Sequence, residues 1–385
     1  MTLITTTEAL AQFCTAHADT DFVTVDTEFM RERTYWPKLC LVQLGGPSES
    51  VAVDPLAPGI DLKPLFDLLA NPKVMKVFHA ARQDVEIFFN LTGTVPTPMV
   101  DTQVAAMVCG FGESASYETL ADKLANAKID KSSRFTDWSH RPLTERQITY
   151  ALGDVSHLRD VYAKLRDQLK ASGRAEWVQE EMAVLTDTAT YRIDPKEIWR
   201  RFKWRADKPR LRALLRELAA WRELEAQRLN VPRNRVLRDE ALMEIAHHAP
   251  SNAHELSRTR GLHAGFAESR QGTEILAAVA HANALPSEQC PSGEPRRILP
   301  NGLAPVMDLL KVLLKQVSEE HGVATKLIAT IDDLEAIAME DDAEVASLHG
   351  WRLELFGKQA LALKRGELAL AIHGKKVAVI PVKSD

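Results

Sequence analysis

The chain has 385 residues, 45% of them hydrophobic and 26% charged, and its formal net charge is −5 at pH 7. These values are typical of a soluble globular protein with two or three domains. They exclude a membrane-spanning protein, because no apolar run approaches the roughly 20 residues that a bilayer requires. The negative charge gives no general indication of nucleic-acid binding.

The N-terminal residues and the cysteines indicate the cellular location to be expected. No basic start followed by an apolar core precedes Asp26, so we expect no signal peptide. The four cysteines are scattered and form no C-x-x-C pair. Such cysteines fit reduced thiols in a cytosolic protein, so we expect a cytoplasmic location.

The first 190 residues alternate strand and helix patterns, which favours an α/β domain with a mixed sheet. In chain order, we expect the strands 23–29, 38–44, 50–54, 74–78 and 99–101. The first three are expected to form a meander. The expected helices are 7–18, 61–69, 81–90, 103–108 and 144–169.

The first expected strand carries two acidic residues, Asp26 and Glu28. Side chains alternate between the faces of a strand, so both carboxylates point the same way. Two adjacent carboxylates repel each other, and a hard divalent cation with oxygen ligands would relieve the repulsion. The alternative is an edge strand with a polar, solvated face.

Asp84 falls in the first turn of the helix 81–90. The helix dipole favours a carboxylate there, so it is interpretable as an ordinary helix-start acid. It lies one turn before Phe88, at the edge of the apolar face, where it can look into a crevice.

Tyr150 and Asp154 lie four residues apart in the helix 144–169, hence on one helical face. Thr144 and Gln147 open this helix like a capping box. The alternative interpretation is a Tyr–Asp pair on the surface.

Together these stretches resemble the DEDD family of 3′→5′ exonucleases. That family has Asp-x-Glu on its first strand, an Asp on a middle helix and Tyr-x-x-x-Asp or His-x-x-x-x-Asp on a late helix. The matching residues are Asp26, Glu28, Asp84, Tyr150 and Asp154. Thr149 stands five before the last aspartate, so the tyrosine type fits and the histidine type does not. The stretches 26–29, 35–37 and 152–155 are similar to the ribonuclease D branch in particular.

The resemblance implies a ribonuclease-H-like exonuclease core and an RNA 3′ end as substrate. It implies that two divalent ions, Mg²⁺ or Mn²⁺, are held by the four carboxylates, and that Tyr150 helps the attacking water. Two such ions can activate a water and stabilise the leaving oxygen. A free tyrosine has a pKa of about 10 and is a poor base at neutral pH, so we expect Tyr150 to orient the water. The implied reaction releases 5′-mononucleotides from tRNA precursors and other small structured RNAs.

Three further features near the site have two interpretations each. Phe29 follows Glu28 and either wedges against the terminal base or packs in the core. His79 ends the fourth expected strand and either faces the substrate or is a satisfied strand-end histidine. The loop 134–141 either lines a substrate groove or is a surface loop with Trp138 buried.

Residues 191–238 are basic, with 15 Lys and Arg against 6 Asp and Glu. Aromatic residues are interleaved among them: Trp199, Phe202, Trp204 and Trp221. This combination suits phosphate contact and base stacking, but a charged, solvated linker and helix face would have the same composition.

Helical patterns follow at 209–228, 239–248, 252–258 and 265–282. With Trp221-Arg222, Asn230-Val231-Pro232 and the stretch 256–261, they resemble an HRDC domain, a module that generally helps to bind nucleic acid. After a linker at 291–295, helices are expected at 304–320, 325–328, 331–339 and 347–356, then a hairpin over 368–380 with its turn at Gly374. The acidic run 340–342 argues against this last part as the main phosphate contact.

The predicted domains are an exonuclease domain (1–190), an HRDC domain (207–288) and a second HRDC-like helical module with a hairpin (296–385). The predicted function is a metal-dependent 3′→5′ exoribonuclease without an obligate protein partner. Two alternatives stay open: a DNA 3′→5′ exonuclease, since the same carboxylates serve proofreading enzymes, and a non-catalytic RNA-binding scaffold.

Overall fold

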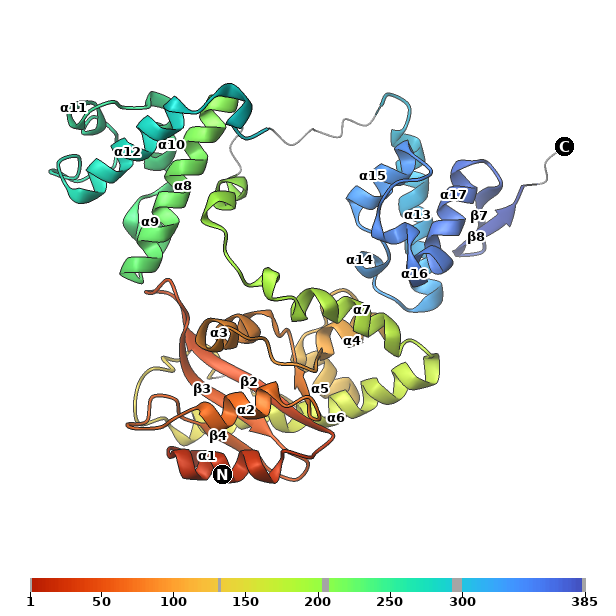
Figure 1. Cartoon of the computed structure of the whole chain (residues 1–385). Coiled ribbons are helices and arrows are strands. Elements are labelled where there is room, and N and C mark those ends of the chain that lie inside the picture. Colours follow the sequence, from red (N-terminus) through yellow and green to blue (C-terminus); the bar gives the residue numbers. More distant parts are fainter. Residues whose placement is uncertain (1, 131–132, 203–207, 293–299, 383–385) are drawn as a thin grey trace. The chain divides into compact units, whose positions relative to one another are not determined.

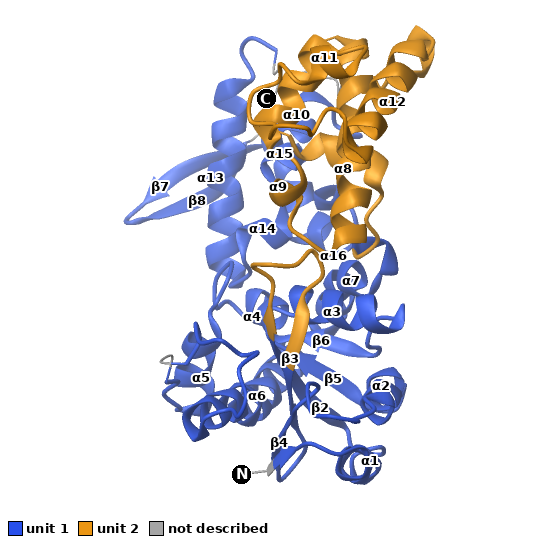
Figure 2. Cartoon of the chain, turned by 90° about the vertical axis from the view of Figure 1, so that its left-hand side faces the viewer, with its two compact units in different colours: residues 1–28, 41–190, 297–385 blue, residues 29–40, 191–296 orange. Residues whose placement is uncertain are grey.

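The computed structural model describes residues 2–130, 133–202, 208–292 and 300–382 (Figure 1). The chain forms two compact units (Figure 2). The first unit comprises residues 1–28, 41–190 and 297–385, and the second comprises residues 29–40 and 191–296. Two of the boundaries between them, after residue 28 and after residue 40, fall within neighbouring strands.

The sheet has six strands in the order β1-β4-β3-β2-β5-β6. They are β1 (Thr2–Ile4), β2 (Phe22–Met30), β3 (Lys38–Gly45), β4 (Ser50–Val53), β5 (Met75–Phe78) and β6 (Met99–Asp101). β3 and β4 pair antiparallel, whereas β1 with β4, β2 with β5 and β5 with β6 pair parallel. This confirms the mixed sheet, with the first three predicted strands as neighbours. The short edge strand β1 was not predicted.

The helices around this sheet are α1 (Thr7–Ala16), α2 (Lys63–Ala70), α3 (Arg82–Thr92), α4 (Thr102–Val108), α5 (Tyr117–Ala125), α6 (Glu145–Ser172) and α7 (Ala175–Thr186). Apolar β-branched residues drive the packing: Val23, Val25 and Val42 have no exposed surface. The Thr144–Gln147 capping box is present at the start of α6. Two helices, α5 and α7, were not predicted.

The last part of the first unit is helical and ends in a hairpin. Its elements are α13 (Ala304–His321), α14 (Thr325–Ile328), α15 (Ile331–Met339), α16 (Gly350–Arg352), a π-helical turn (Leu353–Gly357), α17 (Lys358–Lys364), β7 (Leu368–His373) and β8 (Lys376–Pro381). The hairpin turns at Gly374 as predicted. The predicted helix 347–356 is instead broken. Trp351 stacks on Trp177 of α7, with ring centroids 4.3 Å apart.

The second unit is a helical domain. Its helices are a 3₁₀ segment (Pro195–Arg201), α8 (Pro209–Leu229), α9 (Arg233–Val236), α10 (Asp239–His248), α11 (Ala253–Leu256) and α12 (Arg270–Ala284). α12 begins five residues later than predicted, because Ser269 caps it. Fully buried Leu218, Leu242 and Ile275 form the centre of its core. Trp204 and the linker residues 293–295 lie outside the described residues.

Many of the basic residues in 191–238 are used inside this domain. Arg210 and Arg212 donate to the backbone carbonyls of Ala282 and Pro291. Ion pairs join Arg222 to Asp239, Arg228 to Glu225 and Arg233 to Glu223. These arginines stabilise the domain, so the positive charge available for RNA is smaller than the sequence count indicates.

In the part of the chain that the structure describes, none of the helices combines the length and hydrophobicity of a transmembrane span.

Candidate active site

The site begins where α6 lies directly on β2. The Thr24 hydroxyl donates to the backbone carbonyl of Val155, 2.8 Å away. Gly45, at the end of β3, makes this approach possible. A Cβ atom at Gly45 would lie 2.2 Å from the Thr24 hydroxyl and 3.1 Å from the Val155 carbonyl oxygen. The contact fixes α6 on the strand face that carries the even-numbered residues of β2.

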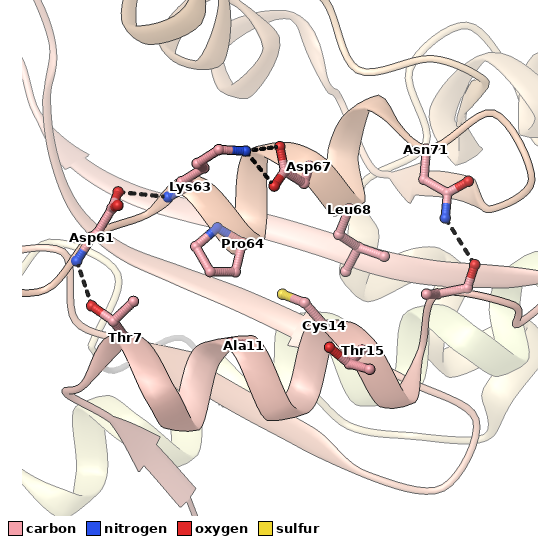
Figure 3. A pocket seen from close by; sticks show the side chains of 11 residues that line it. Thr7, Ala11, Cys14, Thr15, Asp61, Lys63, Pro64, Asp67, Leu68 and Asn71 are labelled. Carbon is pink, nitrogen blue, oxygen red and sulfur yellow. Dashed lines mark hydrogen bonds and ion pairs between the residues drawn. The ribbon is translucent and has the colours of Figure 1, made fainter.

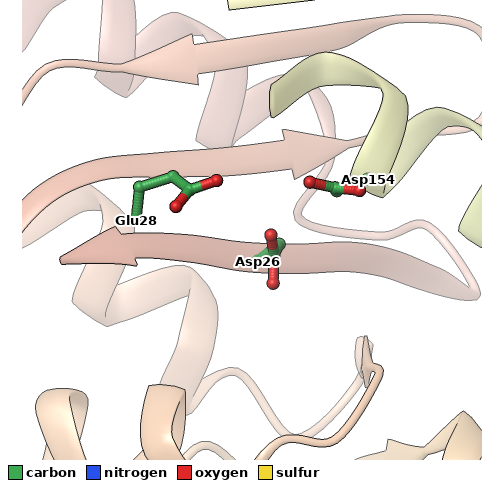
Figure 4. A group of neighbouring side chains, drawn as sticks. All are labelled: Asp26, Glu28 and Asp154. Atoms are coloured by element: carbon green, nitrogen blue, oxygen red, sulfur yellow. The ribbon is translucent and has the colours of Figure 1, made fainter. Parts of the chain in front are cut away.

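Asp26, Glu28 and Asp154 come together on this face (Figure 4). Each offers a carboxylate oxygen, and these oxygens all lie within 4.8 Å of one another. Glu28 and Asp154 lie on either side of Asp26 in this view. Convergent carboxylate oxygens are the ligands that Mg²⁺ and Mn²⁺ prefer, so the donor set fits a divalent cation.

Asp84 approaches the cluster from α3 and is buried. Its carboxylate accepts a hydrogen bond from the hydroxyl of Thr27, the strand residue between Asp26 and Glu28. The turn into α3 is held by Asp101, which accepts from the backbone N–H groups of Ala80 and Ala81 at 2.9 Å each. The structure thus places Asp84 next to the three clustered carboxylates, although it is not among the oxygens within 4.8 Å.

The pKa values of the clustered carboxyl groups are raised, and a bound cation would favour their charged forms. Burial, followed by the neighbouring charges of Asp26, Asp154 and Asp84, raises the pKa of Glu28 to about 10. Burial also raises the pKa values of Asp26, Asp84 and Asp154 above their usual range. Without a counter-charge, these groups therefore hold protons near neutral pH.

Tyr150 lies on α6 with its ring 6.0 Å from that of buried Trp138. Its hydroxyl donates a hydrogen bond to Asp154 and lowers the pKa of that carboxyl, against the larger effect of burial. Burial and the nearby carboxylates raise the pKa of Tyr150 itself, so the phenol stays protonated. It can orient a water but cannot accept a proton at neutral pH.

Two residues near the site were not predicted as part of it. Arg134 is close enough to lower the pKa values of Glu28 and Asp154, so its charge faces the cluster. The Tyr117 hydroxyl donates to the carbonyl of Gly153, next to Asp154, at 2.7 Å. Arg134 was visible only as part of the loop 134–141, for which a substrate groove was one of two interpretations, whereas Tyr117 belongs to a helix that was not predicted.

His79 and Phe29 remain predictions as substrate-binding residues. The His79 Nδ1 atom is 3.0 Å from the Thr102 hydroxyl, and its ring lies 5.6 Å from that of Tyr117. Phe29 is half-buried and follows Glu28 on β2, so strand alternation turns it to the opposite face.

The groove between α1 and α2 is a different place (Figure 3). It has a volume of about 460 Å³ and is lined by residues such as Ala11, Cys14 and Leu68. Burial raises the pKa of the Cys14 thiol to about 12, so it is not a nucleophile at neutral pH. None of the predicted site residues lines this groove.

Comparisons with known proteins agree with this geometry. A family described as 3′-5′ exonuclease matches residues 1–170, and a family described as HRDC domain matches residues 212–279. Ribonuclease D of Nitrobacter hamburgensis is 54% identical, over 98% of this chain and 98% of its own. Ribonuclease D of Granulibacter bethesdensis is 52% identical, over 98% of this chain and 96% of its own. The chain belongs to the ribonuclease D family.

Solved structures show the same likeness over nearly the whole chain. The crystal structure of Escherichia coli RNase D, described as an exoribonuclease involved in structured RNA processing, matches with a TM-score of 0.80. It is 32% identical, and the match covers 94% of this chain and 98% of that one. A protein from Bifidobacterium adolescentis shares the fold, with a TM-score of 0.71 and 20% identity.

Membership of the ribonuclease D family makes this chain a 3′→5′ exoribonuclease with RNA as its substrate. The predicted fold class, an exonuclease core followed by an HRDC region, is confirmed. The roles of the individual site residues remain predictions.

The raised carboxyl pKa values lead to a prediction for the metal-free protein. An acid whose pKa is higher in the folded than in the unfolded state makes the folded state bind more protons, so stability falls as pH rises. The unfolded reference value is 4.5 for Glu28, and its folded value is about 10. With EDTA present, the free energy of unfolding should therefore decline between about pH 5 and about pH 9. Urea denaturation across this range measures it.

The matched control is Glu28→Gln, which removes the titrating group. This variant should lose less stability over the same range, and the difference between the two curves isolates Glu28. In excess Mg²⁺ the wild-type decline should become shallower, because the ion competes better with protons as pH rises. Parallel curves for wild type and Glu28→Gln would contradict the assignment.

Proposed function

We propose that the chain trims RNA 3′ ends, including those of tRNA precursors, one nucleotide at a time, and releases 5′-mononucleotides. We propose a cytoplasmic location, which the four free cysteines support. The observation that carries the reaction is the cluster of three carboxylate oxygens within 4.8 Å, with Asp84 beside it.

We propose that Asp26, Glu28, Asp84 and Asp154 hold two divalent ions, Mg²⁺ or Mn²⁺. When bound, two such ions supply an activated water and charge stabilisation at the leaving oxygen. The chain's own residues orient the water and position the carboxylates. Tyr150 orients the water through its hydroxyl beside Asp154, and Thr27 holds Asp84 toward the site.

We also propose that Phe29 and His79 contact the terminal nucleotide. The domains are proposed as 1–190, 207–288 and 296–385. The last would be a second HRDC-like module, which its helices α13, α15 and α17 support. Exposed basic residues of 191–238, such as Arg192, Arg235 and Arg238, are the better candidates for RNA contact.

One experiment tests the proposed function against its rivals. RNA and DNA oligonucleotides of the same sequence, each labelled internally, are incubated with the protein in Mg²⁺ or in EDTA. Chromatography then identifies the products. We expect stepwise shortening of the RNA from its 3′ end, release of 5′-mononucleotides, and no reaction in EDTA.

Other outcomes have definite meanings. Equal or faster degradation of DNA would favour the DNA exonuclease, and RNA binding without any product would favour the scaffold. A precursor tRNA with a 3′ extension serves as a second substrate. Resistance of the extension, with the unstructured RNA degraded, would refute the proposed tRNA role alone.

A further inference from the structure

The connection between β2 and β3 begins directly after Glu28. Residues 31–38, all of them described by the structure, contain one buried side chain, Tyr35, which is 7% exposed. A buried tyrosine in an otherwise exposed connection needs a partner for its hydroxyl. That partner is α8 of the helical domain, which belongs to the same compact unit as the connection.

Two consecutive residues of the connection bind to α8 and to the turn after it. The Tyr35 hydroxyl donates to Glu223, and Gln227 donates to the Tyr35 oxygen at 3.0 Å. The Trp36 backbone N–H donates to the side-chain oxygen of Asn230 at 3.1 Å. We call these contacts the Tyr35 latch.

The hydrogen-bond acceptor of the Tyr35 hydroxyl, Glu223, is a charged group with no exposed surface. Glu223 is 0% exposed and forms an ion pair with Arg233, with Nη2 2.6 Å from Oε1. The Arg233 guanidinium also lies over the Tyr35 ring, 5.1 Å from its centroid. A buried carboxylate is tolerated only where its oxygens are paired. Tyr35 provides one of these pairings from outside the helices, so losing it leaves a buried acceptor less well satisfied.

The strand that precedes the latch ends close to the site. β2 ends at Met30, two residues after Glu28. Glu28 is also one of the three clustered carboxylates, whose oxygens lie within 4.8 Å of one another, so any negative charge that they share pushes Glu28 away from the other two. A strand end that is not held from beyond Met30 can yield to that repulsion.

We propose that Tyr35 is a positioning residue, which holds the end of β2 against α8 and thereby keeps Glu28 within the carboxylate cluster. The helical domain then contributes to the geometry of the nuclease site as well as to RNA contact. This inference rests on the proposed metal role of Glu28.

The test uses the full chain with Tyr35→Phe, which keeps the ring and removes the hydroxyl. In the metal-free protein, hydrogen exchange of residues 24–30 should become faster. Calorimetry with Mn²⁺ alone should show binding weakened by roughly 10-fold, the scale of a lost supporting hydrogen bond. For a short single-stranded RNA, kcat should fall with KM unchanged, and excess Mn²⁺ should restore part of the loss.

Glu274→Gln is the matched control. It weakens the hydrogen bond from the Trp221 indole N–H in the same domain, 2.8 Å long, without touching residues 29–40. Exchange in β2 and Mn²⁺ affinity should stay at wild-type values. Gln227→Met, which removes one bond to Tyr35, should shift both readouts in the direction of Tyr35→Phe by a smaller amount.

Wild-type exchange and wild-type Mn²⁺ affinity in Tyr35→Phe would overturn the inference. A global loss of protection in that variant, with Gln227→Met unchanged in β2 and in Mn²⁺ affinity, would also overturn it, because Tyr35 would then serve only domain stability. Failure of the wild-type protein to bind Mn²⁺ would instead refute the proposed metal function. The exchange measurement in the metal-free protein is independent of that function.

Discussion

Asp26→Asn is expected to reduce exonuclease turnover by on the order of 10³-fold or more, because a cation-binding carboxylate contributes several kcal/mol of charge stabilisation. The folded state should survive the change. Burial raises the pKa of Asp26 to about 7, so above that pH the carboxylate is charged and the neutral amide removes a buried, repelling charge. At about pH 8 and without metal, the variant should be at least as stable as wild type.

Three measurements check this prediction: turnover on a labelled RNA, Mn²⁺ affinity by calorimetry, and thermal unfolding with and without Mg²⁺. Wild type should gain melting temperature on adding the ion, and Asp26→Asn should gain much less. Asp21→Asn is the control, since Asp21 is an exposed acid just before the same strand. Full activity of Asp26→Asn at saturating metal would refute the proposed metal site.

Tyr150→Phe should lower turnover by about 10²–10⁴-fold, the range of a group that positions or exchanges protons in the transition state. The substitution keeps the ring against Trp138 and removes the hydroxyl that bonds to Asp154. Substrate binding should change little, because an interaction made mainly in the transition state affects kcat. Steady-state kinetics on a short RNA separates kcat from KM.

Tyr162→Phe is the matched control on the same helix. The Tyr162 ring packs edge-on against Phe22 at 4.9 Å, and its pKa is shifted by burial, Arg166 and Asp21 rather than by the carboxylate cluster. This variant should keep wild-type kcat. If Tyr150→Phe also kept it, Tyr150 would be a packing residue, and the water-orienting role would be wrong.

The central part of the site could be predicted because its chemistry is written in local patterns. Alternation on β2 predicted that Asp26 and Glu28 share a face, and the structure brings their carboxylates together. The spacing of four on α6 likewise predicted that Tyr150 and Asp154 share one helical face, and in the structure the Tyr150 hydroxyl donates to Asp154. Such relations depend on a single element, so its period alone determines them.

What was missed depends on contacts between distant parts of the chain. β1 has only three residues, and the strand with which it pairs, β4, lies about fifty residues later in the sequence. The basic character of 191–238 was interpreted as a surface property. Arg222 and Arg233, however, form ion pairs with Asp239 and with buried Glu223. Tyr35 was noted as part of a family-like stretch, yet nothing local shows that its hydroxyl reaches a glutamate 188 residues later. Composition counts charges but does not tell which ones are neutralised inside.

Gly45 has no functional group, yet the separation between Asp26 and Asp154 depends on it. Any side chain there would meet the Thr24 hydroxyl and the Val155 carbonyl, both of which belong to the seam between β2 and α6. α6 would have to move away from the sheet and take Asp154 with it. Selection for nuclease activity in a mutant library should therefore exclude even alanine at position 45, as strictly as it excludes changes in the carboxylates. An inert residue would be indistinguishable from a catalytic one in such data, and only metal-free structural measurements would separate the two.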